Sequence, residues 1–444
     1  MKLKKKRLTS ARIIIGGFMG VILIGAFLLM LPISSKSGAV TPFINALFTS
    51  TSAVCVTGLV VYDTATYWTW FGQFVILLLI QIGGMGVVTI ALSLTMLSGR
   101  KIGLLQRATM QDSISAPRMG GIIKMLRFIL KGVFLLEALG ALAMTFVFIP
   151  MFGWIQGIWF SIFHSISAFC NAGFDLMGVY EPFSSVTYFA GNPIINITIM
   201  CLIVLGGIGF FVWHDIVKYK NHFRKYSLQS KVVLCMTFCL IVLPSIYFYF
   251  FDFASIHSVS ERIFMSLFQS VTARTAGFNT ANFGKMSQTG LMVMILLMLI
   301  GGSPGSTAGG MKTTTLAVML ANLVGIFQKG KAHLFRRRIE ETTVRSASAI
   351  FMLYITLFIS AAMIISRVEG LSILDCMFET SSAVATVGCT MGITPHLMSI
   401  SKAILIALMY FGRVGALTLP FALARSDRYV NSLPEESIRS EERR

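Results

Sequence analysis

The chain has 444 residues, of which 55% are hydrophobic and only 12% are charged. A soluble protein carries about 25% charged residues, so this composition excludes the soluble class and indicates a protein that crosses a membrane several times. The formal net charge of +19 is compatible with nucleic-acid binding as well, and only the positions of the basic residues separate the two interpretations.

Eight apolar stretches are predicted to cross the membrane, because each contains the roughly 20 apolar residues that span a hydrocarbon layer about 30 Å thick. In chain order they are residues 12–33, 70–97, 125–151, 193–217, 232–252, 288–326, 347–366 and 400–424, and the sixth is interrupted. The first stretch follows the basic sequence MKLKKKR and is longer than the core of a secretory signal peptide. We therefore expect it to be retained as a helix.

Basic residues gather in the segments on one side of these stretches. Residues 1–12, 98–131, 218–231, 327–346 and 425–444 together hold 29 of the 37 lysines and arginines. This distribution follows the positive-inside rule, so we expect a multi-pass protein of the cell membrane with both termini in the cytoplasm. Topology and contact with the headgroups of the lipid bilayer account for the charge, and we expect no nucleic acid as a partner.

Four segments on the opposite side resemble one another: FTSTSAVCVTGL, FHSISAFCNAGF, FQSVTARTAGF and FETSSAVATVGC. Each starts with phenylalanine, has serine or threonine two and four residues later and alanine five residues later, and reaches a glycine after 9 or 10 residues. The glycines are Gly58, Gly173, Gly277 and Gly388. One such segment is weak evidence, but four copies at near-constant spacing, each between two apolar stretches, indicate an internal repeat.

The repeat predicts an all-α polytopic membrane protein in which four span–pore-helix–span units surround a pseudo-fourfold central pore. A helix of about 12 residues is too short to cross the membrane, so it must enter and return, and the loop after it needs protein or water around it. The predicted repeats are 12–97, 125–217, 232–326, with the interrupted second span, and 347–424. A basic cytoplasmic N-terminus (1–11), cytoplasmic linkers (98–124, 218–231 and 327–346) and a cytoplasmic C-terminal tail (425–444) flank and connect them.

The end of each repeat segment is predicted to form an ion selectivity filter. No carboxylate or histidine recurs among the four copies, so a site built there must use backbone carbonyls, and glycine permits the left-handed backbone that a row of carbonyls requires. Rings of carbonyls replace the hydration shell of K+ in potassium channels, and residues 386–388 match the start of their TVGYG sequence. The candidate filter residues are Val56, Thr57, Gly58, Asn171, Ala172, Gly173, Thr275, Ala276, Gly277, Thr386, Val387 and Gly388.

None of the four copies retains the second glycine of TVGYG, which predicts fewer well-formed ion sites than in a tetrameric potassium channel. The alternative, that the glycines only make tight turns without ion contact, does not explain their fourfold recurrence.

A glycine cluster follows each filter segment, at residues 83–86, 206–209, 301–305 and 412–415. In the first two copies, close packing of helices explains the small residues equally well. The third copy is lengthened and contains a proline, so we expect a non-helical segment inside the span that opens or closes the path below the filter. The predicted gate comprises Gly301, Gly302, Ser303, Pro304, Gly305, Ser306, Thr307, Ala308, Gly309, Gly310, Met311 and Lys312.

The same stretch resembles the phosphate-binding loop of ATP-hydrolysing enzymes. Such a loop needs G-x-x-x-x-G-K-[ST] after a strand, whereas here Met311 separates Gly310 from Lys312 and both flanks are apolar. We therefore expect a protein that is not an enzyme.

Arg413 interrupts the fourth glycine cluster, in the middle of the last predicted span. An arginine at a helix centre costs roughly 2.5–3.5 kcal/mol on the insertion scale, so we expect it to face the interior of the bundle. Below a carbonyl filter its fixed charge would be a barrier to cations, and it could pair with carbonyls of the third copy. A structural ion pair, or a side chain extended to the membrane surface, is the alternative.

Together these motifs are similar to those of the potassium transporter superfamily that includes Trk, Ktr and the plant HKT proteins, most closely the membrane subunit of bacterial Ktr systems (KtrB-type). The similarity extends over about residues 12–425. It implies a filter glycine in each repeat, an intramembrane gate at residues 301–312 and an arginine barrier at Arg413. Serine at the first filter glycine favours sodium in the plant relatives, so Gly58 points to potassium.

The resemblance also implies a homodimer that sits on a cytoplasmic ring of nucleotide-binding regulatory subunits (KtrA-type). It implies K+ as the transported ion and no organic cofactor on this chain, and it leaves Na+ open as a coupling or activating ion. The predicted function is therefore the potassium-selective, ion-translocating subunit of an uptake system. A sodium or low-selectivity cation transporter on the same scaffold is the alternative.

Overall fold

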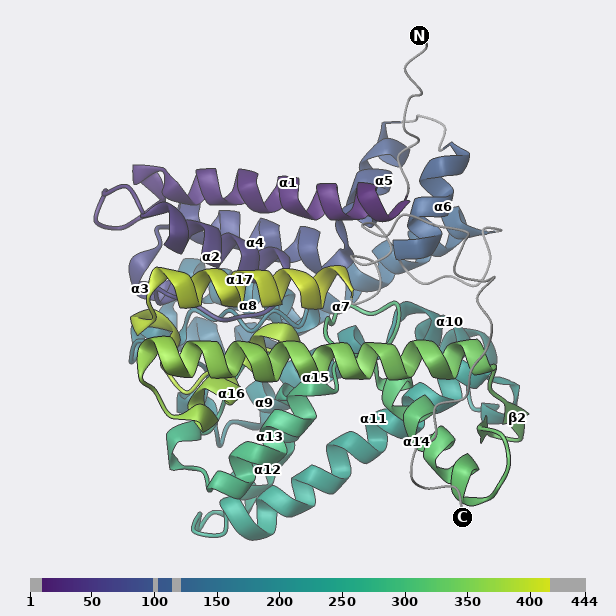
Figure 1. Cartoon of the computed structure of the whole chain (residues 1–444). Coiled ribbons are helices and arrows are strands. Elements are labelled where there is room, and N and C mark those ends of the chain that lie inside the picture. The colour runs from purple at the N-terminus through teal and green to yellow at the C-terminus, as the bar shows by residue number, and fades with distance from the viewer. Residues whose placement is uncertain (1–9, 99–102, 114–120, 416–444) are drawn as a thin grey trace.

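The computed structural model describes residues 10–98, 103–113 and 121–415 (Figure 1). Four helices in it are long and apolar enough to cross a membrane: α1 (Ser10–Met30), α7 (Ile122–Phe152), α11 (Leu228–Tyr247, extended by a π-helical turn to Asp252) and α15 (Glu341–Glu369). They coincide with the spans predicted to open the four repeats. Large apolar side chains such as Phe27, Phe134 and Phe238 are exposed along them, as is typical of helices that face lipid.

Two of the predicted spans, 70–97 and 193–217, are each broken by a sharp bend. The first consists of α4 (Trp70–Met85) and α5 (Val87–Leu97), at 94° to each other, and the second of α9 (Pro193–Gly207) and α10 (Phe210–Tyr219), at 97°. The bends occur at Gly86 and Gly209, whose φ angles of 85° and 92° lie outside the right-handed helical region. Hydropathy does not reveal these bends, because the apolar run continues through them.

The sixth span is interrupted, as predicted. It consists of α13 (Gln288–Leu299), the non-helical residues 300–312 and α14 (Thr313–Phe327). The last span is represented by α17 (Ser399–Val414), and residues 416–424 of its predicted range lie outside the described residues.

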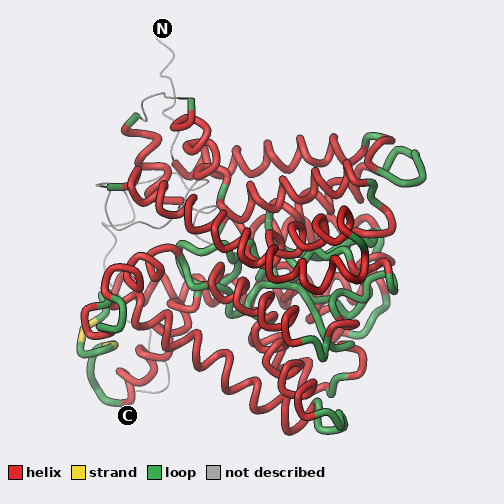
Figure 2. Tube along the Cα trace, turned by 180° about the vertical axis from the view of Figure 1, so that it is seen from behind, coloured by secondary structure: helices red, strands yellow, loops and turns green. Residues whose placement is uncertain are grey.

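Four shorter helices correspond to the predicted re-entrant helices: α2 (Phe43–Val54), α8 (Trp154–Phe169), α12 (Val259–Thr272) and α16 (Ile373–Val384). Each packs against the long helix that precedes it and is followed by a non-helical segment. The phenylalanine that starts each repeat segment is fully buried, and the apolar area it removes from water anchors its helix in the core. Figure 2 shows loops gathered in the interior between the helices.

The linkers contain structure that hydropathy does not predict. α6 (Leu104–Ser113) lies in the linker 98–124, and a small hairpin of β1 (His333–Leu334) and β2 (Arg337–Arg338) lies in the linker 327–346. In Figure 1, α5, α6, α10 and β2 are all at the right end of the helix bundle, whereas the short helix α3 (Thr64–Tyr67) is at the left end. The structured parts of two predicted cytoplasmic linkers, α6 and the hairpin, are thus at the same end of the molecule as α5 and α10, which were predicted to be parts of spans.

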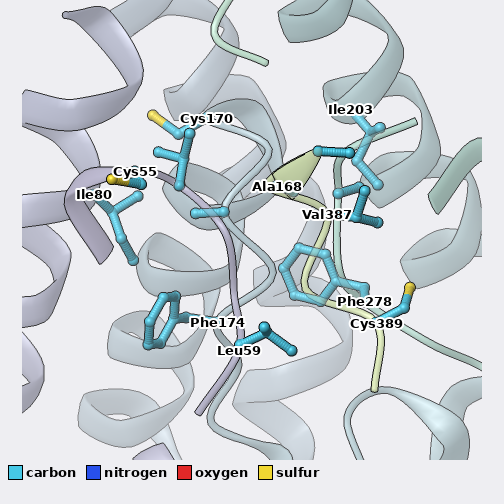
Figure 3. Close-up of a cluster of buried hydrophobic side chains, with 14 of the residues drawn as sticks. Cys55, Leu59, Ile80, Ala168, Cys170, Phe174, Ile203, Phe278, Val387 and Cys389 are labelled. Atoms are coloured by element: carbon cyan, nitrogen blue, oxygen red, sulfur yellow. The ribbon is translucent and has the colours of Figure 1, made fainter. Parts of the chain in front are cut away.

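The apolar core surrounds the non-helical segments that follow the re-entrant helices. The residue after each filter glycine, namely Leu59, Phe174, Phe278 or Cys389, is almost completely buried, and Figure 3 shows all four in one cluster. Close packing on all sides restricts the backbone in these segments to a single path.

Candidate functional site

The four predicted filter segments, which are far apart in the sequence, come together in the structure. A methyl carbon built on each filter glycine would collide with a main-chain carbonyl oxygen of the next segment in chain order, and the fourth glycine faces the first segment. The distance from the added carbon to the carbonyl oxygen is 2.6 Å for Gly58 and Ala172, 2.7 Å for Gly173 and Ala276, 2.6 Å for Gly277 and Val387, and 2.1 Å for Gly388 and Thr57. The segments therefore form a closed ring that has no room for a side chain at any of the four glycines.

The backbone of each filter segment alternates in handedness. The first residue of each triplet has a positive φ, as has the glycine that ends it. The angles at the first residues are 52° for Val56, 57° for Asn171, 67° for Thr275 and 53° for Thr386. This conformation costs a non-glycine residue roughly 1–2 kcal/mol, and such strain clusters at functional sites. A positive φ at both ends of each triplet is compatible with a row of backbone carbonyl ligands.

The serine or threonine four residues after each repeat phenylalanine holds the filter backbone. Its carbonyl oxygen accepts a hydrogen bond of 2.8–2.9 Å from the amide of the middle filter residue in all four copies. The hydroxyl groups of Ser52 and Ser382 also accept from the amides of Gly58 and Gly388, at 3.1 and 2.9 Å. In the second and third copies the hydroxyl donates instead to the carbonyl of the residue after the glycine. The recurrence of this residue was visible in the sequence, but its role was not.

The predicted gate, residues 301–312, lies against the first residues of the second and fourth filter segments. The Thr307 hydroxyl donates to the side-chain oxygen of Asn171 in the second segment, at 2.8 Å. A methyl carbon on Gly309 would lie 2.1 Å from the hydroxyl oxygen of Thr386 in the fourth segment. The gate segment is therefore in direct contact with the ring.

Main-chain hydrogen bonds fasten the gate segment to two of the other glycine clusters. The amide of Ser303 donates to the carbonyl of Gly207 at 3.0 Å, and the amide of Gly310 donates to that of Gly412 at 3.3 Å. Protein groups thus satisfy part of this non-helical backbone, as a non-helical segment inside a membrane requires.

Arg413 faces the interior and connects the last predicted repeat with the third and the first. Its guanidinium donates to the carbonyl of Thr307 in the gate segment and to the carbonyls of Gly83 and Gly84 in the first repeat, the last at 3.1 Å. No carboxylate lies within ion-pair distance of Arg413 in the described part of the chain. Of the arrangements that the sequence left open, the pairing with carbonyls of the third copy is the one observed.

A cavity of about 300 Å³ adjoins the gate segment and is lined by Lys312, Arg413 and Asp112, among others. The ammonium group of Lys312 donates to the carbonyls of Ala308 and Gly309, at 2.8 and 3.2 Å. Two positively charged side chains, from the gate segment and from α17, thus border the same cavity.

The glycine clusters share a packing role. A methyl carbon on Gly83, Gly206 or Gly412 would lie 2.0–2.1 Å from the carbonyl oxygen of the last residue of the preceding re-entrant helix. The close packing that the sequence suggests for the first two copies therefore extends to the fourth. In the third copy the cluster is part of the gate segment.

Two acidic side chains lie beyond the filter in the first and second repeats. Asp63 caps α3 by accepting hydrogen bonds from the amides of Ala65 and Thr66, at 3.0 and 2.8 Å, so its carboxylate has a structural use. Asp175 lies two residues after Gly173 and is partly exposed. Burial, and to a smaller extent the charge of Asp63, raise the pKa of Asp175 to about 7.

Comparison with known proteins identifies relatives along the whole chain. A family model named TrkH and described as a cation transport protein matches residues 8–432. The Potassium/sodium uptake protein NtpJ of Enterococcus hirae is 42% identical over 98% of both chains. The Ktr system potassium uptake protein B of Bacillus subtilis is 38% identical, also over 98% of both chains. Its namesake in Vibrio alginolyticus is 34% identical over 96% of this chain and 94% of that protein.

A solved structure shares the fold. The potassium transporter TrkH from Vibrio parahaemolyticus superposes with a TM-score of 0.73 over 96% of this chain and 87% of that one, at 19% identity. The family model and the relatives above 30% identity each extend over nearly the whole length. The chain therefore belongs to the TrkH family of cation transport proteins.

Proposed function

We propose that this protein is the potassium-selective, ion-translocating membrane subunit of a potassium uptake system. The closed ring of four filter segments carries the proposal, because its alternating backbone can present carbonyl oxygens to an ion that has lost its water. The names of the relatives, which are potassium or potassium/sodium uptake proteins, support the same ion.

In this proposal the four repeats surround a pseudo-fourfold pore, and K+ passes between the carbonyls of residues 56–58, 171–173, 275–277 and 386–388. Residues 301–312 obstruct the path on the inner side of this filter. Arg413 supports the obstruction in two ways, since its hydrogen bond to Thr307 holds the segment in place and its charge repels cations. Transport then requires that this hydrogen bond be released and the segment move.

The proposed location is the cell membrane, with both termini in the cytoplasm, and the proposed assembly is a homodimer on a ring of nucleotide-binding regulatory subunits. The placement of α5, α6, α10 and the hairpin at one end of the bundle supports a common cytoplasmic face on which such subunits could bind (Figure 1). A regulatory subunit bound there would act on the gate segment through the helices that surround it.

A second candidate function is transport of Na+, or of both ions with little discrimination. The name of NtpJ, which includes sodium, favours it. Glycine at all four filter positions favours potassium instead, because a side chain at any of them would displace a neighbouring carbonyl.

Uptake of Rb+, a substitute for K+, into liposomes that contain the purified protein tests the function. We expect uptake down an imposed gradient that exceeds uptake into empty liposomes and that exceeds Na+ uptake at least about tenfold, equivalent to about 1.4 kcal/mol of discrimination. Equal uptake of the two ions would favour the second candidate. Absence of flux, even with a regulatory subunit and Na+ supplied, would contradict both.

Uptake from dilute Rb+ is expected to rise about two- to threefold as the external pH increases from 6 to 8. Over this range Asp175, whose pKa is about 7, loses its proton, so the neutral carboxyl becomes a carboxylate that attracts cations. In water, a unit charge about 8 Å from a solvated ion contributes about 0.5 kcal/mol. The rise should disappear in Asp175→Asn and persist in Glu181→Gln, which removes an exposed acid from the same outer loop. A rise that persists in Asp175→Asn would exclude this carboxylate as its cause.

A further inference from the structure

The residue directly after each repeat phenylalanine is polar and buried, although it differs in every copy. It is Thr49, His164, Gln269 or Glu379, with at most 1% of its surface exposed. A buried polar group requires a hydrogen-bond partner. In three of the four copies that partner belongs to the stretch of chain that follows the filter glycine, which is called the strand leaving the filter although it is not part of a β-sheet.

In the second copy, His164 accepts a hydrogen bond on Nε2 from the amide of Leu176, at 3.2 Å. Its Nδ1 donates to the carbonyl of Phe160, one turn earlier in α8, at 2.7 Å. This pair of bonds requires the neutral imidazole with its proton on Nδ1. The histidine therefore acts as a neutral acceptor for the strand that leaves the second filter segment.

In the third copy, Gln269 has the same role with an amide. With its side-chain oxygen turned toward the strand, the orientation that satisfies both amide atoms, Gln269 accepts from the amides of Thr280 and Ala281, at 3.3 and 3.1 Å. The donating amides are those of the third and fourth residues after the filter glycine, and the third is also the donor in the second copy.

In the fourth copy, Glu379 is the acceptor. Its Oε1 accepts from the hydroxyl of Thr390 at 2.7 Å and from the hydroxyl of Thr394. Its Oε2 is buried without a hydrogen-bond partner among the described residues. Thr390 in turn accepts from the amide of Gly392 at 2.9 Å, so the carboxylate holds the turn that begins two residues after Gly388.

The first copy is the exception. The hydroxyl of Thr49 donates to the carbonyl of Asn45 in its own helix, at 3.0 Å. The strand after Gly58 is held instead by Asn45, whose side chain donates to the hydroxyl of Tyr62 at 2.7 Å.

We infer that Glu379 is a positioning residue that sets ion selectivity by holding the strand leaving the fourth filter segment. Only Cys389 separates Gly388 from Thr390, so a displacement of the Thr390 turn is transmitted to the carbonyls of residues 386–388. Selectivity depends on the acceptor atom of residue 379 and not on its charge. Gln269 holds its strand with a neutral amide, and the second carboxylate oxygen of Glu379 holds nothing. This inference rests on the proposed function, in which these carbonyls contact K+.

The test compares Glu379→Gln with Glu379→Leu in the full-length protein in liposomes, with the ratio of Rb+ to Na+ uptake as the readout. We expect Glu379→Gln to keep the ratio within about twofold of wild type, because the amide oxygen still accepts from Thr390. We expect Glu379→Leu to lower the ratio at least about fivefold, because the leucine side chain has no acceptor. Asp375→Asn, which removes an acid one turn earlier in α16, serves as the control and should leave the ratio unchanged.

Thr390→Val provides a second route if Glu379→Leu does not fold, since it removes the donor and leaves the carboxylate. It should lower the ratio as well, and combining it with Glu379→Leu should lower the ratio little further, because the hydrogen bond that Thr390→Val removes is one of the two that Glu379→Leu removes. A selective wild type together with unchanged selectivity in a folded Glu379→Leu, or in Thr390→Val, would overturn the inference and leave the proposed function intact. Loss of selectivity in Glu379→Gln equal to that in Glu379→Leu would show that charge, not position, is the determinant. A wild-type protein without selectivity would overturn the proposed function and this inference with it.

Discussion

Replacing Gly388 with serine is expected to lower the ratio of Rb+ to Na+ uptake about tenfold or more, equivalent to at least about 1.4 kcal/mol. A methyl carbon at this position would lie 2.1 Å from the carbonyl oxygen of Thr57, the shortest of the four approaches in the ring. The φ of 96° also disfavours any residue with a side chain. The Thr57 carbonyl must therefore move, and the ring no longer replaces the hydration shell of K+ in preference to that of Na+.

Gly370→Ser is a matched control for this substitution. Gly370 directly follows α15 in the same repeat, has a φ of 69°, and has no other group within 4 Å of an added methyl carbon. Gly370→Ser also places a side chain at a positive φ, but it does not crowd a carbonyl. The ratio of Rb+ to Na+ uptake in this variant should therefore equal that of wild type. A wild-type ratio in Gly388→Ser, with the protein folded, would remove this glycine from the proposed filter. An equal loss in both variants would attribute the effect to destabilisation alone.

Deleting residues 306–310 is expected to raise Rb+ flux about tenfold in the absence of a regulatory subunit, as removal of about 1.4 kcal/mol from a barrier would do. The deletion removes Thr307, and with it the hydrogen bonds that tie the gate segment to Asn171 and to Arg413. Flux per folded protein in liposomes is the measurement. The filter residues are untouched, so the ratio of Rb+ to Na+ uptake should change little.

Ser306→Ala is the control that distinguishes removal of the obstruction from a general loosening of the gate segment. The Ser306 hydroxyl donates to the carbonyl of Ser303, at 2.6 Å, within the segment itself. This substitution should leave flux near the wild-type value, whereas Thr307→Val should raise it part of the way. A deletion variant that folds and transports no faster than wild type would argue that residues 306–310 do not obstruct the path.

Hydropathy and the repeat predict most of the helices, because each depends only on residues that are close in sequence. The spans that open the repeats lie within a few residues of α1, α7, α11 and α15. The interruption of the sixth span was also predictable, since proline and glycine oppose a helix wherever they are packed. The bends at Gly86 and Gly209 were not, because the apolar residues on both sides of each bend read as one continuous span.

The candidate site also has features that depend on residues close in sequence and features that depend on contacts between distant residues. The spacing from phenylalanine to glycine selected the proposed filter residues. The positive φ angles at the first residue and the glycine of each triplet are a property of the local backbone. Which carbonyl each glycine faces, and which carbonyls Arg413 binds, involves residues in different repeats. The role of Glu379 was hidden for the same reason, because His164 and Gln269, the two equivalents that also hold the chain leaving the filter, differ from it chemically.

The sequence by itself determined the membrane class and the positions of most helices, and it selected the residues that we propose for the filter and the gate segment, because hydropathy and motif spacing are properties of single segments. Only the tertiary structure decided that the four filter segments close into a ring, that the gate segment contacts this ring, and that Arg413 binds carbonyls rather than a carboxylate. These are contacts between distant parts of the chain, and they exist only once the chain has folded.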